Sequence, residues 1–548
     1  MKAGFAYQNF VAPKPHKLAA RRKKGMVITM KYKINRSNYR DFQTISENRL
    51  PHRSYFIPFG SEERMRSVSY LDERAQSDRV LFLSGEWEFA YFQSAAKLPD
   101  TLDTDRQLFD PIHVPSTWQK TGYDKINYLN SMYPFRCNPP KTPKNCPVGV
   151  YRKTFPLEKR ENDTYLGVAS SLDVYLNGKY VGYGEGSHNS REFDLTPFLQ
   201  NGENELVAVV YKWSTGTYLE CQDMFRENGI FRDVYITCQP ESYLYDFCFE
   251  KQKAGGGYRA RITADIRGGK TARLQAKLLF GEKTIAEQTV WAGEPICWES
   301  LAVEEWSAEN PVCYDLILSV SDGGRELQCV RQKVGFCTIE LDGCRYLFNG
   351  QPVKFKGVNH HDTHPVRGYA MTVKDLLRDI ELMKAYHVNC VRTSHYPPDS
   401  LMLTMCDVYG LYVVDEADLE THGCFVKNMD LISDDPKWEA HYLDRIQALY
   451  ERDKNHPSIV MWSMGNEAGG IRNFDACYEY LKTKTEIPVH YEPACRSERV
   501  RYDILAYFYT PPEEMRALSR GEWTHEKDYD APFFLCEYAH SMGVGPGA

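Results

Sequence analysis

The chain has 548 residues, more than one hydrophobic core usually serves, so about three domains are expected. Its 67 basic and 74 acidic side chains give a net charge of −7, which argues against a nucleic-acid-binding surface. No stretch approaches the ~20 apolar residues that a membrane span needs. An aromatic content of 13% suits a protein that stacks rings against sugar faces, although large cores also use aromatic residues.

Residues 1–48 are polar and weakly patterned, and we interpret them as a tail or arm. Their basic cluster, Lys14–Lys24, has no apolar run behind it and is therefore not a signal peptide. The 16 cysteines of the chain are scattered singly and form no Cys-x-x-Cys motif, which argues against a zinc knuckle or a thioredoxin-like site. Because no export signal is found, we expect the protein to reside in the reducing cytoplasm. Cys390, Cys406 and Cys536 lie in apolar segments and are expected to be buried free thiols.

Short β runs separated by turn signals fill residues 49–239. Asn177-Gly178 lies between alternating apolar positions, which is a strong hairpin signal, and helical periodicity is nearly absent. We therefore predict a jelly-roll β-sandwich for residues 49–239. Residues 240–336 continue the all-β pattern at the length of an immunoglobulin-like β-sandwich.

From residue 337 onward, strand-like runs alternate with helical runs, which predicts a parallel sheet with right-handed crossovers. Seven strands are expected, at 354–361, 389–395, 411–420, 459–467, 488–491, 503–509 and 533–538. The helical runs lie at 372–386, 398–409, 438–455 and 474–485. Because a closed (β/α)8 TIM barrel needs eight strands, residues 337–548 are predicted to form a truncated, incomplete barrel that carries the catalytic site.

Two glutamates are the most informative residues of the chain. Glu467 follows the apolar run Ile459–Trp462, and Glu537 follows Pro532–Leu535. Both runs suit buried parallel strands, and the carboxyl ends of barrel strands are where catalytic residues gather. Either glutamate alone could simply accept hydrogen bonds from loop amides. Together they supply the two carboxyl groups that hydrolysis of a glycosidic bond requires, one as the acid and one as the nucleophile or base.

Other polar side chains follow the remaining predicted strands, which favours a functional cavity at this edge of the sheet. Glu420 and His422, two residues apart, project to one side of an extended segment. With Glu467 nearby, two carboxylates and an imidazole suit Mg²⁺ or Mn²⁺ better than zinc. On spacing alone, a plain salt-bridge network is an equally good interpretation.

Longer motifs run through most of the chain. They comprise residues 114–119, 182–184, 192–195 and 229–234 in the first β domain, and residues 357–361, 391–397, 410–417, 420–423, 455–458, 462–469 and 535–543 in the barrel. In these motifs the chain resembles glycoside hydrolase family 2, and within that family the β-galactosidase type.

The resemblance implies a retaining glycoside hydrolase that removes terminal non-reducing β-D-galactose from lactose-type substrates by double displacement. Glu467 would be the acid/base, Glu537 the nucleophile, and Asn466 the residue that holds the sugar 2-hydroxyl. The resemblance also assigns further contacts: His361, His395 and Arg392 in the galactose pocket, Tyr509 near the nucleophile, His540 at the distal hydroxyls, and Glu420, His422 and Glu467 around Mg²⁺.

The chain departs from the family pattern in two ways. The family has an aspartate that helps to bind Na⁺ where this chain has Gly186, with Glu185 and Glu192 nearby, so a sodium site is a weaker expectation. Family chains also continue beyond the end of this one, with an eighth strand and two further β domains. We therefore expect a loose barrel with little activity alone, and a homo-oligomer for the full-length form.

Two other interpretations stay open. One is a β-glucuronidase or β-mannosidase of the same family, and the other is a catalytically inert carbohydrate-binding fragment. The expected partner is a β-galactoside substrate, with neither nucleic acid nor a membrane.

Overall fold

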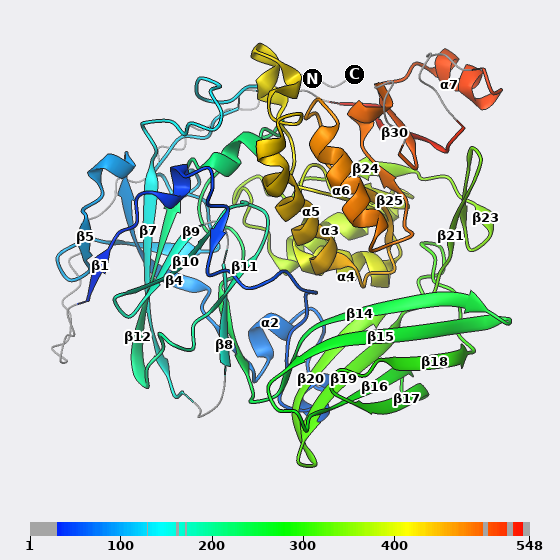
Figure 1. Cartoon of the computed structure of the whole chain (residues 1–548), viewed down its shortest axis with the longest axis horizontal. Helices are drawn as coiled ribbons and strands as arrows, with labels where there is room; N and C mark the ends of the chain where they lie inside the picture. The colour runs from blue at the N-terminus through cyan, green and yellow to red at the C-terminus, as the bar shows by residue number, and fades with distance from the viewer. Residues whose placement is uncertain are drawn as a thin grey trace, which may run out of the picture.

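The computed structural model describes residues 30–128, 130–159, 164–169, 172–496, 502–522 and 530–540, so the Lys14–Lys24 cluster lies outside the described residues. Figure 1 shows two β parts and, above the second, a mixed part in which helices surround parallel strands. No helix within the described residues is long and apolar enough to cross a membrane.

The first β part consists of two antiparallel sheets that share one hydrophobic core. The larger sheet has the order β2 (Ser46–Glu47), β10 (Lys179–Gly184), β9 (Leu172–Leu176), β12 (Gly202–Tyr211), β7 (Val148–Leu157), β4 (Gly85–Phe92) and β6 (Asp110–Val114). The smaller has the order β11 (Arg191–Asp194), β8 (Thr164–Ala169), β13 (Tyr235–Gln239) and β3 (Val80–Phe82). Asn177 and Gly178 join β9 to β10 with φ values of 51° and 80°, as a two-residue hairpin of the I′ type requires. The predicted sandwich is confirmed.

Residues 30–48 form an arm that lies on this sandwich. Its strand β1 (Lys31–Lys33) pairs with β5 (Thr101–Asp103), and β2 pairs with β10. Tyr32 is fully buried, and its hydroxyl donates to Glu205 Oε1 over 2.9 Å. The segment docks because Tyr32 and Ile34 alternate with polar residues and present one apolar face.

The second β part is a smaller antiparallel sandwich. One sheet has the order β14 (Tyr243–Ala254), β15 (Gly257–Arg267) and β18 (Ile296–Leu301), and the other has the order β17 (Lys283–Trp291), β16 (Arg273–Phe280), β19 (Tyr314–Asp322) and β20 (Arg325–Val334). Alternate residues of these strands, among them Leu274, Leu278 and Leu316, face one core between the sheets. The immunoglobulin-like sandwich is therefore also confirmed. Two short helices, α1 (Glu62–Arg66) and α2 (Glu73–Gln76), lie in the chain between β2 and β3 of the first sandwich.

After a small sheet of β21 (Ile339–Asp342), β22 (Arg345–Phe348) and β23 (Gln351–Pro352), the barrel part begins. Its seven parallel strands are β24 (Gly357–Asn359), β25 (Cys390–Arg392), β26 (Tyr412–Glu416), β27 (Ile459–Ser463), β28 (Val489–His490), β29 (Leu505–Phe508) and β30 (Phe533–Glu537). The first five form one sheet and the last two another, so the barrel is not closed within the described residues. All seven strands lie where the sequence predicted them.

The helices between these strands are α3 (Val373–Ala385), α4 (Ser400–Tyr409), α5 (Glu439–Asp453), α6 (Arg472–Lys482) and α7 (Pro512–Ser519). Local sequence signals set their ends. Thr372 and Asp375 form a capping box at the start of α3, and Gly410 ends α4 with a φ of 77° that favours glycine. The short helix α7 was not predicted, because it follows a proline pair and has no buried residue.

The first β part is attached to the barrel next to the strand ends. Glu220 and Glu420 form a parallel bridge, in which the Cys221 amide donates to Glu420 O over 2.9 Å and the Glu420 amide donates to Leu219 O over 2.7 Å. Tyr218 and Leu219 belong to the same hydrophobic core as the barrel helices. A loop of the sandwich is thus held at the carboxyl ends of the barrel strands.

Candidate active site

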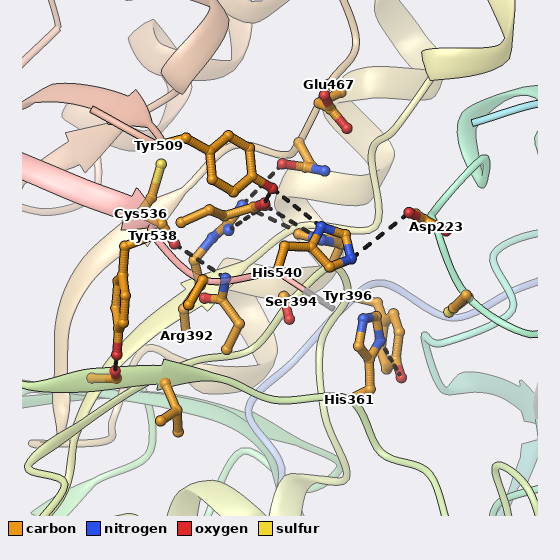
Figure 2. A pocket seen from close by; sticks show the side chains of 18 of the residues that line it. Asp223, His361, Arg392, Ser394, Tyr396, Glu467, Tyr509, Cys536, Tyr538 and His540 are labelled. Atoms are coloured by element: carbon orange, nitrogen blue, oxygen red, sulfur yellow. Dashed lines mark hydrogen bonds and ion pairs between the residues drawn. The ribbon is translucent and has the colours of Figure 1, made fainter. Parts of the chain in front are cut away.

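A cavity of about 670 Å³ lies at the carboxyl ends of the parallel strands, and Figure 2 shows part of its lining. Side chains from β24, β25 and β30 contribute to it, together with the loops that follow β27 and β29. The cavity brings together all the predicted site residues except Glu420: Glu467, Glu537, Asn466, His361, His395, Arg392, Tyr509, His540 and His422. Glu420 lies directly behind this wall, completely buried.

Glu537 is the last residue of β30, and two neighbours orient its carboxylate. The Tyr509 hydroxyl donates a hydrogen bond to Oε2, and Arg392 Nη1 lies 3.2 Å from Oε1. Tyr509 has a φ of 53°, and burial together with the bond to Glu537 raises the pKa of its phenol. The hydroxyl therefore stays protonated as a donor to Glu537.

Arg392 ends β25 and connects Glu537 to Asn466, because its Nη2 also donates to Asn466 Oδ1 over 3.1 Å. The guanidinium is held from behind by Glu416 at the end of β26, to which Nε donates over 2.7 Å. His395 Nδ1 lies 2.6 Å from the other oxygen of Glu416. Burial opposes the ionisation of Glu416, but the charges of Arg392 and His395 outweigh it and lower the pKa of that carboxyl.

Glu467 lies in the loop after β27, and its closest ionisable neighbour is His422. His422 Nδ1 is 2.8 Å from Glu467 Oε2. Burial opposes the ionisation of Glu467, but His422 and the charges of His395 and Arg392 outweigh burial and lower its pKa. The loop is tightly packed: Gly465 has a φ of 145°, and a Cβ there would lie 2.5 Å from Leu419 O.

Glu420, His422 and Glu467 fit a divalent cation. One potential ligand atom from each lies within 4.8 Å of the others. Glu420 Oε2 accepts from Asn466 Nδ2 over 2.9 Å, whereas Oε1 is buried without a hydrogen-bond partner among the described residues. Burial, and then the charge of Glu467, raises the pKa of Glu420 well above its ordinary value. A buried carboxylate oxygen that faces a second carboxylate and an imidazole matches the oxygen-rich coordination of Mg²⁺.

The residues considered for sodium do not fit a cation. A Cβ at Gly186 would collide with the Arg191 guanidinium and would lie 3.0 Å from Arg445 Nη1. Two guanidinium groups therefore occupy the region in which the resemblance would put a sodium-binding aspartate carboxylate. Glu185 Oε1 accepts from two hydroxyl groups instead, and Glu192 is paired with Arg53 at 2.7 Å.

The histidines of the cavity differ in their surroundings. His361 is close to Tyr396, with Nδ1 3.3 Å from the hydroxyl, and burial lowers its pKa well below the ordinary value. His540 Nδ1 lies 3.1 Å from the Tyr509 hydroxyl, while its Nε2 faces Asp223 (Figure 2). His361 is therefore neutral, whereas His540 lies between a hydroxyl and a carboxylate.

Sequence reasoning missed three residues at this site. Glu416 had a signal, since it is an acidic residue within the predicted strand 411–420, and in the structure it ends β26. Tyr538, whose hydroxyl donates to Gly357 O over 2.7 Å, follows Glu537 directly. Asp223 had no signal, because it belongs to a loop of the first β part, and only the fold brings that loop to the barrel.

Three family descriptions match successive parts of the chain. The sugar binding domain of glycosyl hydrolases family 2 matches residues 80–240, the description "Glycosyl hydrolases family 2" matches residues 243–336, and the TIM barrel domain of the same family matches residues 339–548.

Curated relatives cover most of this chain. A protein of Actinobacillus pleuropneumoniae named "Beta-galactosidase" is 36% identical over 549 residues, which is 93% of this chain and 53% of the relative. Proteins of the same name from Alteromonas mediterranea and Staphylococcus xylosus are 38% and 35% identical and match 85% and 91% of this chain. The chain spans about half the length of the curated relatives it matches.

Similar solved structures include a β-D-glucuronidase from Dictyoglomus thermophilum, with a TM-score of 0.69 and 21% identity over 85% of this chain and 84% of that one. A β-glucuronidase from Ruminococcus gnavus gives a TM-score of 0.69 and 20% identity over 86% of this chain and 85% of its own. At these identities the likeness establishes the shared fold alone.

Proposed function

The chain belongs to glycosyl hydrolases family 2. From that premise we propose that it forms the catalytic part of a retaining glycosidase, which removes terminal β-D-galactose from lactose-type substrates. The observation that carries the proposal is the pair of carboxylates that line one cavity, Glu537 from the end of β30 and Glu467 from the loop after β27. Arg392 contacts Glu537 and also Asn466, the neighbour of Glu467. The relatives named β-galactosidase support galactose as the sugar.

The reaction would proceed in two displacements. In the first, a Glu537 oxygen forms a bond to the anomeric carbon while the glycosidic carbon–oxygen bond breaks and Glu467 gives its proton to the leaving oxygen. In the second, Glu467 takes a proton from water, whose oxygen attacks the anomeric carbon from the face that the leaving group vacated, breaks the bond to Glu537 and restores the starting configuration. Tyr509 and Arg392 fix the attacking carboxylate in one orientation.

Glu467 has to be protonated in the first step and ionised in the second. Its lowered pKa in the open cavity suits the second role, in which it acts as a base. A bound sugar would exclude water from the cavity and make the Glu467 charge less favourable, which would raise its pKa toward the value that the acid role needs.

Glu420, His422 and Glu467 are the residues that would hold Mg²⁺, as their geometry suits. When bound, the ion would supply a fixed positive charge that stabilises the carboxylate form of Glu467. The buried Oε1 of Glu420, which has no hydrogen-bond partner in the described part of the chain, is the structural support for this assignment.

We also place the protein in the cytoplasm. Its support is the state of the cysteines, since the fifteen whose side chains the structure describes are free thiols, among them buried Cys390, Cys406 and Cys536. A reducing compartment maintains thiols in that state.

The decisive experiment is to trap the covalent intermediate. A 2-deoxy-2-fluoro-β-galactoside with a good leaving group should label Glu537, as located by mass spectrometry of the digested protein, and the Glu537→Gln variant should neither become labelled nor turn over substrate. Glu299→Gln, a change of an exposed glutamate in the second sandwich, is the matched control and should behave like the wild type. Labelling elsewhere, or an inverted product in an NMR time course, would overturn the proposal.

A further inference from the structure

A continuous series of polar side chains runs from Glu537 to the opposite wall of the cavity. The Tyr509 hydroxyl donates to Glu537, and His540 Nδ1 lies 3.1 Å from that hydroxyl. Beyond the imidazole ring, His540 Nε2 lies 3.9 Å from Asp223 Oδ2. A dashed line marks this contact in Figure 2. Asp223 is thus the polar group at the far end of the series, distal to the carboxylate that would attack the anomeric carbon.

Asp223 is held in place by contacts of its own loop with the barrel. The adjacent residue Gln222 donates from Nε2 to Asp418 Oδ1 over 2.8 Å, and the Cys221 amide donates to Glu420 O. After Asp223, Arg226 Nη1 donates to Glu220 O over 2.7 Å, which ties the two sides of the loop to each other. These bonds fix the loop on both sides of Asp223, so its carboxylate has a defined position in the cavity wall.

The carboxylate of Asp223 has unused capacity for hydrogen bonds. Oδ1 is buried and has no hydrogen-bond partner among the described residues. The 3.9 Å between Oδ2 and His540 Nε2 is too long for a hydrogen bond. An oxygen atom that enters beside the pair can, however, lie about 2.8 Å from both atoms. With a proton on His540 Nε2, a hydroxyl group in that position would accept from the imidazole and donate to the carboxylate, which can only accept.

A substrate carboxylate would not meet the same requirement. It could accept from His540, but it has no proton to donate to Asp223, and the two negative charges would repel each other. The buried guanidinium of Arg392 would not compensate, because it is committed to Glu416 at 2.7 Å and to Glu537 at 3.2 Å. Two further carboxylates, those of Glu467 and Glu537, line the same cavity.

Resting on the proposed function, we infer that Asp223 is a specificity-determining residue. With His540 it recognises a neutral hydroxyl on the side of the sugar distal to the anomeric carbon and excludes a uronic acid. The jelly-roll part of the chain therefore supplies a residue that selects neutral hexosides over uronides, although the catalytic carboxylates come from the barrel.

The test compares two substrates that differ only at carbon 6, 4-nitrophenyl β-D-galactoside and 4-nitrophenyl β-D-galacturonide. In Asp223→Asn, kcat/KM for the galactoside should fall about 10- to 100-fold, the range for loss of a hydrogen bond to a charged group. The galacturonide-to-galactoside ratio of kcat/KM should rise at least tenfold, since the amide can donate to a carboxylate. Asp223→Ala should show the same direction of change. Asp265→Asn, an exposed aspartate of the second sandwich, should match the wild type.

Calorimetric titration with galactose and galacturonate provides a reading that needs no turnover. Asp223→Asn should raise the affinity for galacturonate relative to galactose at least tenfold. An unchanged preference in both measurements, in variants that melt as the wild type does, would overturn the inference and leave the proposed function intact. A wild type that hydrolyses or binds the uronide in preference to the galactoside would instead overturn both.

Discussion

Arg392 Nη1 lies 3.2 Å from Glu537 Oε1, and this ion pair joins two sheets that share no strand pairing within the described residues. Arg392 ends β25 in the five-stranded sheet, whereas Glu537 ends β30 in the two-stranded one. The position of Glu537 relative to Glu467, which follows β27, therefore depends on side chains as well as on the backbone.

Removal of the Arg392 guanidinium should destabilise the barrel. Arg392→Ala would leave the carboxylate of Glu416 buried without its main partner, and breaking a buried pair in this way costs about 3–5 kcal/mol in the free energy of unfolding. The double variant Arg392→Ala/Glu416→Gln should recover at least ~1 kcal/mol, because the unpaired charge is gone. Urea unfolding followed by fluorescence measures both. The control Arg259→Ala, at an exposed ion pair, should change stability by less than ~1 kcal/mol. Equal stability of the single and double variants would contradict the coupling.

Binding of Mg²⁺ should depend on Glu420 and His422. In the wild type, Mg²⁺ should raise the melting temperature because it binds the folded state, and a chelator should reverse the rise. Glu420→Gln and His422→Ala should weaken the binding about 10-fold or more, as read from titration calorimetry without substrate. Glu299→Gln is the control with an exposed carboxylate. Identical titration curves for all four proteins would indicate a salt-bridge network in place of a metal site.

Loss of the Tyr509 hydroxyl should impair turnover and leave the fold unchanged. Tyr509→Phe removes the donor to Glu537 and the contact with His540, while the ring is 48% exposed and contributes little burial. We expect kcat to fall about 10- to 1000-fold and the free energy of unfolding to change by less than ~1 kcal/mol. Steady-state kinetics and urea unfolding test this pair of outcomes. An unchanged kcat would mean that Tyr509 does not orient the nucleophile.

Glu185 should make stability dependent on pH. Burial raises the pKa of Glu185 from 4.5 to about 7 against the hydrogen bonds from Thr215 and Tyr183. The folded state keeps a proton on Glu185 that the unfolded state releases. The contribution of this protonated carboxyl to the free energy of unfolding is therefore fully present below about pH 4.5 and is lost as the pH rises through 7.

The comparison with Glu185→Gln isolates that contribution. The stability of the wild type relative to this variant should decline by as much as about 3 kcal/mol between pH 4.5 and pH 8. Glu299→Gln should give a difference from the wild type that hardly varies with pH. Urea unfolding at several pH values supplies the data, and a constant difference for Glu185→Gln would show that this carboxyl is ionised throughout the range.

The sequence by itself determined the seven parallel strands of the barrel part, the two preceding sandwiches and the positions of Glu467, in the loop after β27, and Glu537, at the end of β30. These features are local. The period of apolar residues, the capping box at Thr372 and the Asn177-Gly178 turn each act over a few neighbouring positions. Family motifs added the other residues of the pocket, and the cavity brings nine of the ten predicted site residues into its lining.

Only the tertiary structure decided which distant groups meet. Asp223 faces His540 across more than 300 positions of chain because a sandwich loop pairs with the barrel at Glu420. In the same way, Arg445 of α5 stands beside Gly186, which removes the expected place for sodium. Such contacts are set by the packing of domains and by the charge balance of buried groups. Neither leaves a periodic pattern in the residues around it, so the sequence could not predict them.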